Sequence, residues 1–315
     1  MRYYIMEKWV VALGGNALLG PKEKQFALSE IRNASRAMDT IARAAVKRNA
    51  MLVITHGNGP QVGDEIIKNE LSKRELPMLP LFLMNAETQG SIGSILATAL
   101  RNSLFKIGAK RGIGAIITHV VVDKEDIAFK NPTKPVGPIY TKRKLEAEIK
   151  IARFRYIKEG GGYRRVVSSP YPKEVLEIGE IGKMLERGEM VIAGGGGGIP
   201  VVKIGKAFKG VDAVIDKDLA SLVLANGIDA DRLIILTDVD YVYKDFKNKR
   251  GPIKRASAGY MQSILSTFEE GTIKPKVEAC IKFVEGDRNR KAYIGNLMKL
   301  EDILKGVSGT HIYAE

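Results

Sequence analysis

Cysteine is almost absent from this chain, because Cys280 is the single one among 315 residues. One cysteine excludes an intrachain disulfide and favours a reducing compartment. No apolar run reaches the roughly 18–20 residues that span a bilayer, and residues 1–8 lack the apolar stretch of a secretory signal. We therefore expect a cytoplasmic protein that has no membrane partner.

Histidine is also scarce, with only His56, His119 and His311 in the chain. None of them combines with cysteine or acidic residues at a spacing typical of zinc ligands. Each is more simply explained as a polar residue satisfied within the fold. Cys280 has no evident partner for nucleophilic catalysis. We predict neither a metal site built from side chains nor a cysteine nucleophile.

The two commonest nucleotide-binding signatures are missing as well. No Gly-Lys-Ser or Gly-Lys-Thr stands at Walker spacing. Residues 57–63 nearly imitate a dinucleotide fingerprint, but Val62 stands where the third glycine is expected. A nucleotide site in this chain would have to be built in another way.

Acidic residues are outnumbered, with 36 Asp and Glu against 50 Lys and Arg and a formal surplus of 14. Such a surplus suits nucleic acid, an anionic membrane surface or a polyphosphate ligand. A solvated basic surface with charge networks explains it equally well. No basic patch interleaved with aromatic residues and no helix-turn-helix pattern is present, so we expect no nucleic-acid partner.

Short apolar segments alternate with longer amphipathic ones, which is the pattern of βαβ units and a parallel sheet. Nearly every predicted strand ends in Gly, Asn or Asp. Polar and backbone groups should therefore gather at the carboxyl edge of the sheet, where open α/β sheets bind ligands. The predicted strands cover residues 9–13, 51–55, 115–122, 190–193 and 232–236, and apolar spacing predicts a helix over residues 29–47.

Residues 123–172 interrupt this alternation with prolines, glycines and charged residues. The stretch is too long and too rich in aromatic residues for a linker. We interpret it as an inserted subdomain, or lid, over the site.

Glycines follow three of the predicted strands. Gly14 with Gly15, and the segment Gly57–Gly59, would let the backbone approach a phosphate closely with free N–H groups. An ordinary tight turn explains the first pair nearly as well. Five consecutive glycines at 194–198 would destabilise a regular element by several tenths to about 1 kcal/mol each. We favour a ligand-related role for this run over a flexible surface loop.

Two lysine-containing segments suggest an anion site. Lys217 lies between Asp216 and Asp218, just before an apolar helical stretch for which Asp218 is a suitable N-cap. An adjacent carboxylate can keep a phosphate-directed ammonium charged and aimed, although an exposed ion pair of little worth is the alternative. Lys274 and Lys276 stand in a Gly/Pro turn at a helix start, where anions bind well; a solvated basic turn is the other explanation.

Taken together, these segments resemble carbamate kinase, within the amino-acid kinase fold. The resemblance extends from residue 9 almost to the end of the chain, and its blocks occur in family order. Residues 131–138 distinguish it from acetylglutamate and aspartate kinases, which have a lysine-bearing first strand where this chain has Ala12. The matching blocks are 11–17, 54–63, 122–123 with 131–138, 164–170, 194–198, 213–220, 236–239 and 275–277.

The resemblance implies a three-layer αβα sandwich with an open, mainly parallel sheet and a protruding inserted subdomain. It also implies Mg²⁺-dependent phosphoryl transfer between ATP and carbamate, which gives ADP and carbamoyl phosphate, with Mg²⁺ held mainly through nucleotide phosphates. Residues 1–315 would form one domain and act as a homodimer. Residues 1–209, including the lid at 123–172, would form the carbamate and phosphoryl side, and residues 210–315 the nucleotide-binding lobe.

The resemblance also implies roles for particular residues. Lys217 and Lys276 would contact the phosphates and the transferring group, and Asp218 would organise the two lysines. Lys134 would bring a charge from the lid onto the substrate, and Asn16 would help to hold the phosphoryl end. Phosphate or substrate contacts are expected from Gly14, Gly15, Gly57, Asn58, Gly59, Gly195, Gly196 and Gly197, and nucleotide contacts from Thr237, Asp238, Tyr243 and Lys276.

The chain departs from the family at a few positions, where Gly194 replaces serine, Ser91 replaces tryptophan and residues 273–274 replace Met-Gly. None of these removes a charged catalytic position. Because the attacking oxygen of carbamate is already anionic, the lack of an obvious histidine base agrees with this chemistry. Two alternatives stay open: another acid kinase of the same fold that acts on a larger carboxylate or phosphate acceptor, and, more remotely, a basic nucleic-acid-binding protein.

Overall fold

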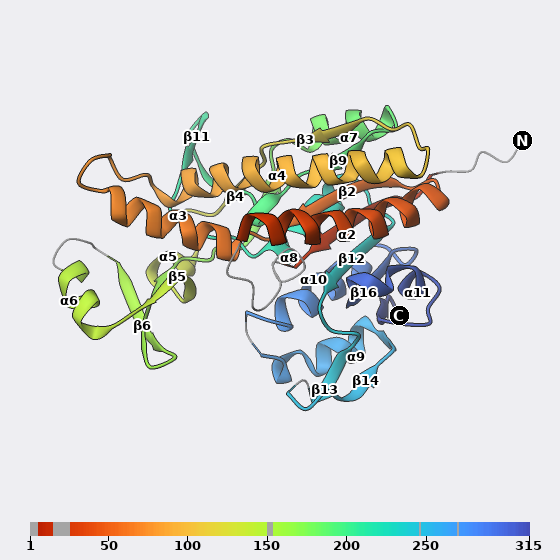
Figure 1. The fold of residues 1–315 in the computed structure, drawn as a ribbon. Coiled ribbons are helices and arrows are strands. Elements are labelled where there is room, and N and C mark those ends of the chain that lie inside the picture. Colours follow the sequence, from red (N-terminus) through yellow and green to blue (C-terminus); the bar gives the residue numbers. More distant parts are fainter. Residues whose placement is uncertain (1–5, 15–25, 150–153, 246, 270) are drawn as a thin grey trace, which may run out of the picture.

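The structure of the chain is a computed structural model that describes residues 6–14, 26–149, 154–245, 247–269 and 271–315. Within these residues a large, mainly parallel sheet forms the middle of the molecule (Figure 1). Among the described residues of this sheet, the strands β16 and β17 pair antiparallel and the other neighbouring strands pair parallel. In spatial order its strands are β15 (Arg255–Ser257), β17 (Thr310–Tyr313), β16 (Lys291–Asn296), β12 (Arg232–Thr237), β1 (Lys8–Leu13), β2 (Met51–His56), β9 (Met190–Ile192) and β3 (Ile113–Ala115).

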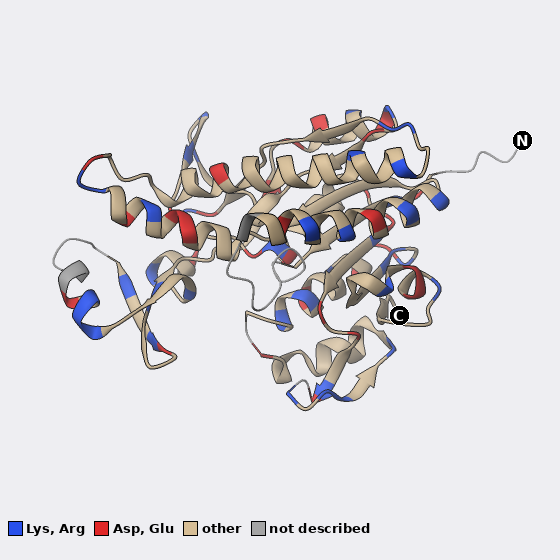
Figure 2. Cartoon of the chain, in the orientation of Figure 1, with Lys and Arg blue, Asp and Glu red and all other residues tan. Residues whose placement is uncertain are grey.

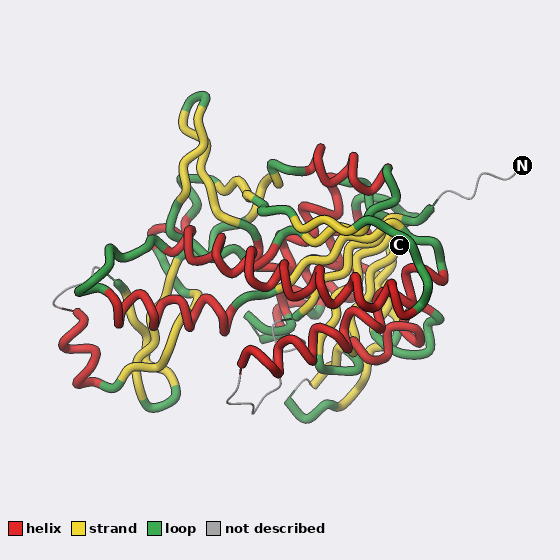
Figure 3. The backbone as a smooth tube through the Cα atoms, turned by 45° about the horizontal axis from the view of Figure 1, so that its top comes forward, coloured by secondary structure: helices red, strands yellow, loops and turns green. Residues whose placement is uncertain are grey.

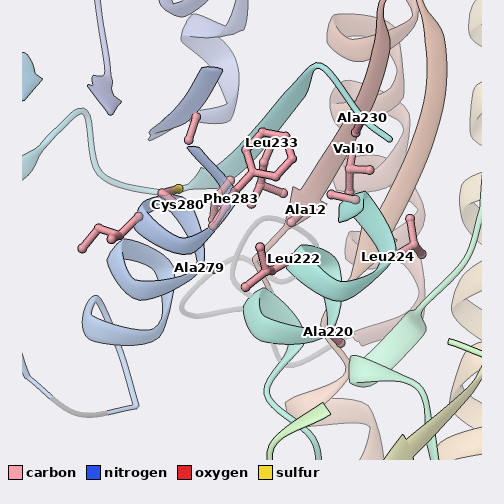
Figure 4. Close-up of a cluster of buried hydrophobic side chains, with 14 of the residues drawn as sticks. Val10, Ala12, Ala220, Leu222, Leu224, Ala230, Leu233, Ala279, Cys280 and Phe283 are labelled. Atoms are coloured by element: carbon pink, nitrogen blue, oxygen red, sulfur yellow. The ribbon is translucent and has the colours of Figure 1, made fainter. Parts of the chain in front are cut away.

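Helices cover both faces of this sheet, as the tube view shows (Figure 3). Alternate residues of β1 face opposite layers, because successive side chains of a strand point to opposite sides. Trp9 and Val11 pack in the core under one layer, whereas Val10 and Ala12 pack in the core under the other (Figure 4). The first layer contains α2 (Phe26–Lys47), α4 (Leu81–Lys106) and α11 (Leu300–Leu304), and the second contains α7 (Ile178–Glu186), α8 (Lys217–Gly227), α9 (Ala258–Ser263) and α10 (Lys274–Glu285). The predicted αβα fold is confirmed.

The predicted insert contains a small sheet of its own, which lies apart from the main sheet (Figure 1). Its strands β5 (Lys134–Tyr140), β7 (Gly162–Val167) and β6 (Arg155–Glu159) pair antiparallel. It joins the body where β5 packs along α3. The nearby helices are α3 (Gly59–Ser72), α5 (Ile127–Lys130) and α6 (Lys142–Ile149).

Two further sheets complete the described chain. The first has four strands, in the order β11 (Ala207–Gly210), β10 (Ile199–Ile204), β4 (His119–Val122) and β8 (Pro172–Val175). The second pairs β13 (Val242–Asp245) with β14 (Arg250–Ile253).

Lys and Arg residues are spread over helices of both layers and over the small sheet of the insert, interspersed with acidic residues (Figure 2).

The prediction of a single strand over residues 115–122 is wrong. The segment forms two strands that belong to different sheets, since β3 pairs with β9 and β4 pairs with β10. Between them, the backbone N–H of Thr118 donates to the side chain of Gln89 at 2.8 Å. This contact joins residues far apart in the sequence and lies where the chain passes from β3 to β4. The apolar pattern of residues 115–122 alone could not predict it.

Candidate active site

The carboxyl ends of four neighbouring parallel strands form the floor of the site. β9, β2, β1 and β12 lie side by side, so the segments that follow them meet at one edge of the sheet. Gly14 follows β1, Gly57 follows β2, and the run that starts at Gly194 follows β9 closely. The expected convergence of glycine-rich segments at this edge is therefore present in the structure.

A buried carboxylate flanked by two ammonium groups lies above this edge. Asp218 stands in the first turn of α8, and only 3% of its side chain is exposed. Its Oδ1 forms an ion pair with Lys217, and its Oδ2 accepts a hydrogen bond of 2.8 Å from Lys276 in the first turn of α10. Two helix N-termini thus place two lysines around one aspartate, an arrangement that favours anionic ligands.

Burial and the neighbouring charges have opposing effects on the pKa values of these three groups. Burial alone would raise the pKa of Asp218, but Lys217 and Lys276 together hold that pKa well below its usual range. Burial and the nearby charge of Lys276 lower the pKa of Lys217, although Asp218 opposes both. For Lys276 the burial penalty is outweighed by Asp218, so its pKa is raised. The cluster carries one more positive than negative charge when all three groups are ionised.

Asp216, not Asp218, is the N-cap of α8. The Asp216 side chain accepts a hydrogen bond of 2.9 Å from the backbone N–H of Asp218. The prediction of Asp218 as the cap is wrong, because the backbone leaves extended conformation at Asp216, two residues earlier. Asp218 is thereby left free to hold the two lysines.

Lys134 joins the same cluster from the small sheet of the insert. Its Nζ lies 3.4 Å from Oδ2 of Asp216 and 3.4 Å from the carbonyl oxygen of Ile215. The side chain is 29% exposed, more than those of Lys217 and Lys276. The sequence-predicted lysines therefore meet in space, although they come from three separate elements.

The run of glycines at 194–198 forms a tight turn that contains η1 (Gly195–Gly197). Gly194 and Gly196 have φ values of 65° and 62°, in the left-handed region that favours glycine. A Cβ added to Gly195 would lie 2.5 Å from Nε2 of His56, and one added to Gly197 would lie 2.5 Å from the carbonyl oxygen of Ile215. Backbone conformation and close packing against the protein itself thus require glycine here, and the predicted ligand contacts of Gly195, Gly196 and Gly197 stay a prediction.

The backbone amides that were expected to be free are partly engaged. The N–H of Gly14 donates to the carbonyl of Leu236 at 2.9 Å, and the N–H of Gly57 donates to the carbonyl of Leu13 at 3.1 Å. The expectation of free N–H groups is wrong at these two positions, because the ladder of the parallel sheet continues past the strand ends. Gly59 lies in the first turn of α3, where amides lack an intrahelical acceptor.

A buried network of amide and hydroxyl side chains supports the glycine turn, and sequence reasoning missed most of it. Asn58 donates to the side chains of Asn85 and Thr88, and Asn85 donates to the carbonyl of Gly198 at 2.6 Å. Asn85, Thr88 and Gln89 are spaced three and four residues apart on α4, so they share one face of that helix. This polar stripe inside a largely apolar helix is the signal that could have revealed the network.

The residues predicted for the nucleotide follow β12. Thr237 ends this strand, and its hydroxyl donates to Asp238 at 3.0 Å. The pKa of Lys276 is raised mainly by Asp218, and the charge of Asp238 contributes to a smaller extent. Asp238 therefore lies near the lysine cluster. Tyr243 is half-buried on β13. Gly15 and Asn16 lie outside the described residues.

The amino acid kinase family profile matches residues 7–296. The chain belongs to the amino acid kinase family. It is 41% identical over 315 residues to carbamate kinase 2 of Staphylococcus aureus, with 98% of this chain and 99% of the relative covered. Its fold is similar to that of the Giardia lamblia carbamate kinase bound to AMP-PNP, with a TM-score of 0.92, 34% identity, and 98% and 99% of the two chains covered. A structure from Aeropyrum pernix is equally similar in fold, with a TM-score of 0.92, 37% identity, and 98% and 100% coverage.

These similarities confirm the predicted resemblance to carbamate kinase over nearly the whole chain, and they support a phosphotransferase that acts on carbamate. Among the described helices, none is both long enough and apolar enough to span a membrane.

Proposed function

We propose that this chain is a carbamate kinase, which transfers a phosphoryl group reversibly between ATP and carbamate. The observation that supports the proposal most directly is the buried cluster of Lys217, Asp218 and Lys276 at the start of two helices. Two anions must come together in this reaction, and positioned cations reduce their repulsion. The cluster provides such cations at the carboxyl ends of the parallel strands.

The chemistry needs no general base. The attacking oxygen of carbamate already carries negative charge, so catalysis depends on positioning and on charge. His56, which is buried beside the site, has its pKa lowered to about 4, mainly by burial and further by Lys217. It is therefore neutral near pH 7 and adds no charge of its own.

The proposed roles follow the positions of the side chains. Lys217 and Lys276 contact the transferring phosphoryl group, and Asp218 keeps both ammonium groups aimed. Lys134 approaches from the small sheet and contacts the carbamate end. Asn16, with Gly14, Gly15 and the two other glycine-containing segments, encloses the phosphoryl end, while Thr237, Asp238 and Tyr243 lie toward the ribose and base.

The residues present fit Mg²⁺ that enters with the nucleotide. Both oxygens of Asp218 are paired with lysines, and those of Asp216 accept an amide N–H and lie near Lys134. Among the residues that the structure describes, no group of three or more His, Cys, Asp or Glu is arranged to hold a metal. When bound through the phosphates, Mg²⁺ would neutralise part of their charge.

The organisation of the whole enzyme is proposed by the same family resemblance. Residues 1–209 bind the carbamate and phosphoryl side, with residues 123–172 as a lid, and residues 210–315 bind the nucleotide. The enzyme is a cytoplasmic homodimer that catalyses the reaction in both directions.

A coupled assay tests this function. Carbamoyl phosphate with MgADP should yield ATP, measured by luciferase, and the yield should depend on enzyme concentration. Lys217→Ala should lower turnover by about 10²–10³-fold, because the transition state loses one positively charged hydrogen-bond donor. ADP formation from ATP with acetate, aspartate or glutamate, but not with carbamate, would show that the enzyme is a different acid kinase.

A further inference from the structure

β5 carries Lys134 at its first residue and Tyr140 at its last. Lys134 is only loosely held by its own side chain, because both of its contacts, to Asp216 and to the carbonyl of Ile215, are 3.4 Å long. Ordinary N–H···O hydrogen bonds are about 2.9–3.0 Å long. The location of the Lys134 ammonium group therefore depends on how the backbone of β5 is held.

The opposite end of β5 is fixed on α3 by a buried hydrogen bond. Tyr140 is 1% exposed, and its hydroxyl donates to Oε1 of Glu70 on α3. Nζ of Lys144 lies 3.6 Å from Oε2 of Glu70 and 4.9 Å from the centre of the Tyr140 ring. Burial, and further the carboxylate of Glu70, raise the pKa of Tyr140 well above its usual value. The hydroxyl therefore keeps its proton and stays a donor to a charged acceptor.

A second contact with α3 lies at the middle of β5. Gly63, Ile66 and Glu70 are three and four residues apart on α3, so they share one face of that helix. A Cβ added to Gly63 would lie 3.6 Å from Cα of Gly137, and one added to Gly137 would lie 3.4 Å from Cγ2 of Ile66. The backbone of β5 thus rests directly on the helix at Gly137.

This middle contact alone would leave β5 free to tilt. Gly137 is three residues from Lys134 and three from Tyr140, and three residues of a strand span about 10 Å. The pairing of β5 with β7 shifts register between Val136 and Ile139, so the ladder is interrupted at the same point. A displacement of the Tyr140 end would therefore produce a displacement of similar size at Lys134.

We propose that Tyr140 and Glu70 are positioning residues for the reaction, because their hydrogen bond prevents β5 from tilting about Gly137 and so holds Lys134 in place. This inference rests on the proposed function, in which Lys134 contacts the carbamate end of the substrate. A misplacement of about 1 Å can cost about 10²-fold in rate. Tyr140 and Glu70 thus act through Lys134 and not by contact with the substrate.

A double-mutant cycle tests the proposal. Tyr140→Phe removes the hydroxyl and keeps the ring, and it should lower kcat/KM for carbamoyl phosphate about tenfold, with the KM for ADP within about twofold. In the Lys134→Ala background the same change should alter kcat/KM by less than about twofold, because the group that it positions is absent. An equal loss in the two backgrounds would overturn the proposal.

Variants of Glu70 separate the hydrogen bond from the charge. Glu70→Gln keeps an oxygen acceptor on a side chain of the same length and should stay within about threefold of wild type, whereas Glu70→Ala should match Tyr140→Phe. Equal losses in Glu70→Gln and Glu70→Ala would contradict the role of the hydrogen bond. Tyr293→Phe is the matched control, because Tyr293 is buried on β16 of the main sheet and its hydroxyl accepts from Arg232 at 3.3 Å. A comparable loss of kcat/KM in this control would also overturn the proposal.

Amide hydrogen exchange tests the anchoring of β5 independently of activity. Tyr140→Phe and Glu70→Ala should speed exchange in residues 134–140 at least about threefold, and Tyr293→Phe should not. Unchanged exchange of β5 in both variants would overturn the proposal even if activity falls. A wild-type chain that forms no ATP from carbamoyl phosphate and MgADP would instead contradict the proposed function, so the two failures are distinguishable.

Discussion

Neutralising Asp218 should destabilise the protein strongly, because this carboxylate is the partner of two buried lysines. Lys217 and Lys276 have side chains only 12% and 17% exposed. At the 2.8 Å of the Lys276 contact, Coulomb attraction with an effective dielectric constant of about 20 is about 6 kcal/mol before the desolvation cost. Removing one partner of a buried pair typically costs about 3–5 kcal/mol, because the other charge stays buried and unpaired.

We therefore expect Asp218→Asn to lower the free energy of unfolding by about 3–5 kcal/mol near neutral pH, a large part of the usual 5–15 kcal/mol. Chemical denaturation followed by circular dichroism measures it. Lys217→Met combined with Asp218→Asn should cost less than the sum of the single changes, since one of the two ammonium groups that lose Asp218 is then absent. Asp123→Asn is the control: Asp123 pairs with Lys173 at 2.6 Å on the surface, and its loss should not move the midpoint.

The pH dependence of the Asp218→Asn variant has a definite sign. Without its partner, buried Lys217 should have a folded-state pKa further below that of the unfolded chain. Stability then rises with pH between the two values, because the unfolded state binds the additional proton. The deficit relative to wild type should narrow as the pH is raised from about 7 toward about 9.5. A deficit below about 1 kcal/mol at neutral pH, or one that widens with pH, would refute the reasoning about buried charges.

Three further predictions concern other positions. Lys134→Ala should raise the KM for carbamoyl phosphate and lower kcat, with the KM for ADP within about threefold, because Lys134 approaches from the small sheet; steady-state kinetics that show a loss of ADP affinity alone would place it in the nucleotide site. His56 has a folded pKa of about 4, so the unfolded state binds the additional proton below about pH 6.5, and its contribution should fall by about 2 kcal/mol between pH 7 and about pH 5. Denaturation at both pH values should show a smaller loss in His56→Gln, and an equal loss would contradict this. Cys280 is fully buried, and burial raises the pKa of its thiol. Ellman's reagent should therefore modify it only in denaturant. Stoichiometric labelling of the native protein would contradict the packing of α10.

The parts of the fold that could be predicted from the sequence are those determined by local patterns. Buried parallel strands appear as short apolar runs, so β1, β2, β9 and β12 were predicted nearly within their observed bounds. The break between β3 and β4 was missed, because it accompanies a contact with Gln89, far away in the sequence. The engaged amide of Gly14 was missed for a similar reason, since its acceptor Leu236 lies on a neighbouring strand.

The two aspartates that flank Lys217 show what sequence alone leaves open in the site. Either one can cap a helix by composition, and only the backbone conformation decides that Asp216 does so. The consequence is a division of roles. Asp216 satisfies an amide at the helix start and contacts Lys134. Asp218 lies two residues further along and is nearly unexposed, and both of its oxygens are left for Lys217 and Lys276. If Asp218 had been the cap, one of its oxygens would have had to accept the backbone N–H as well as a lysine hydrogen bond.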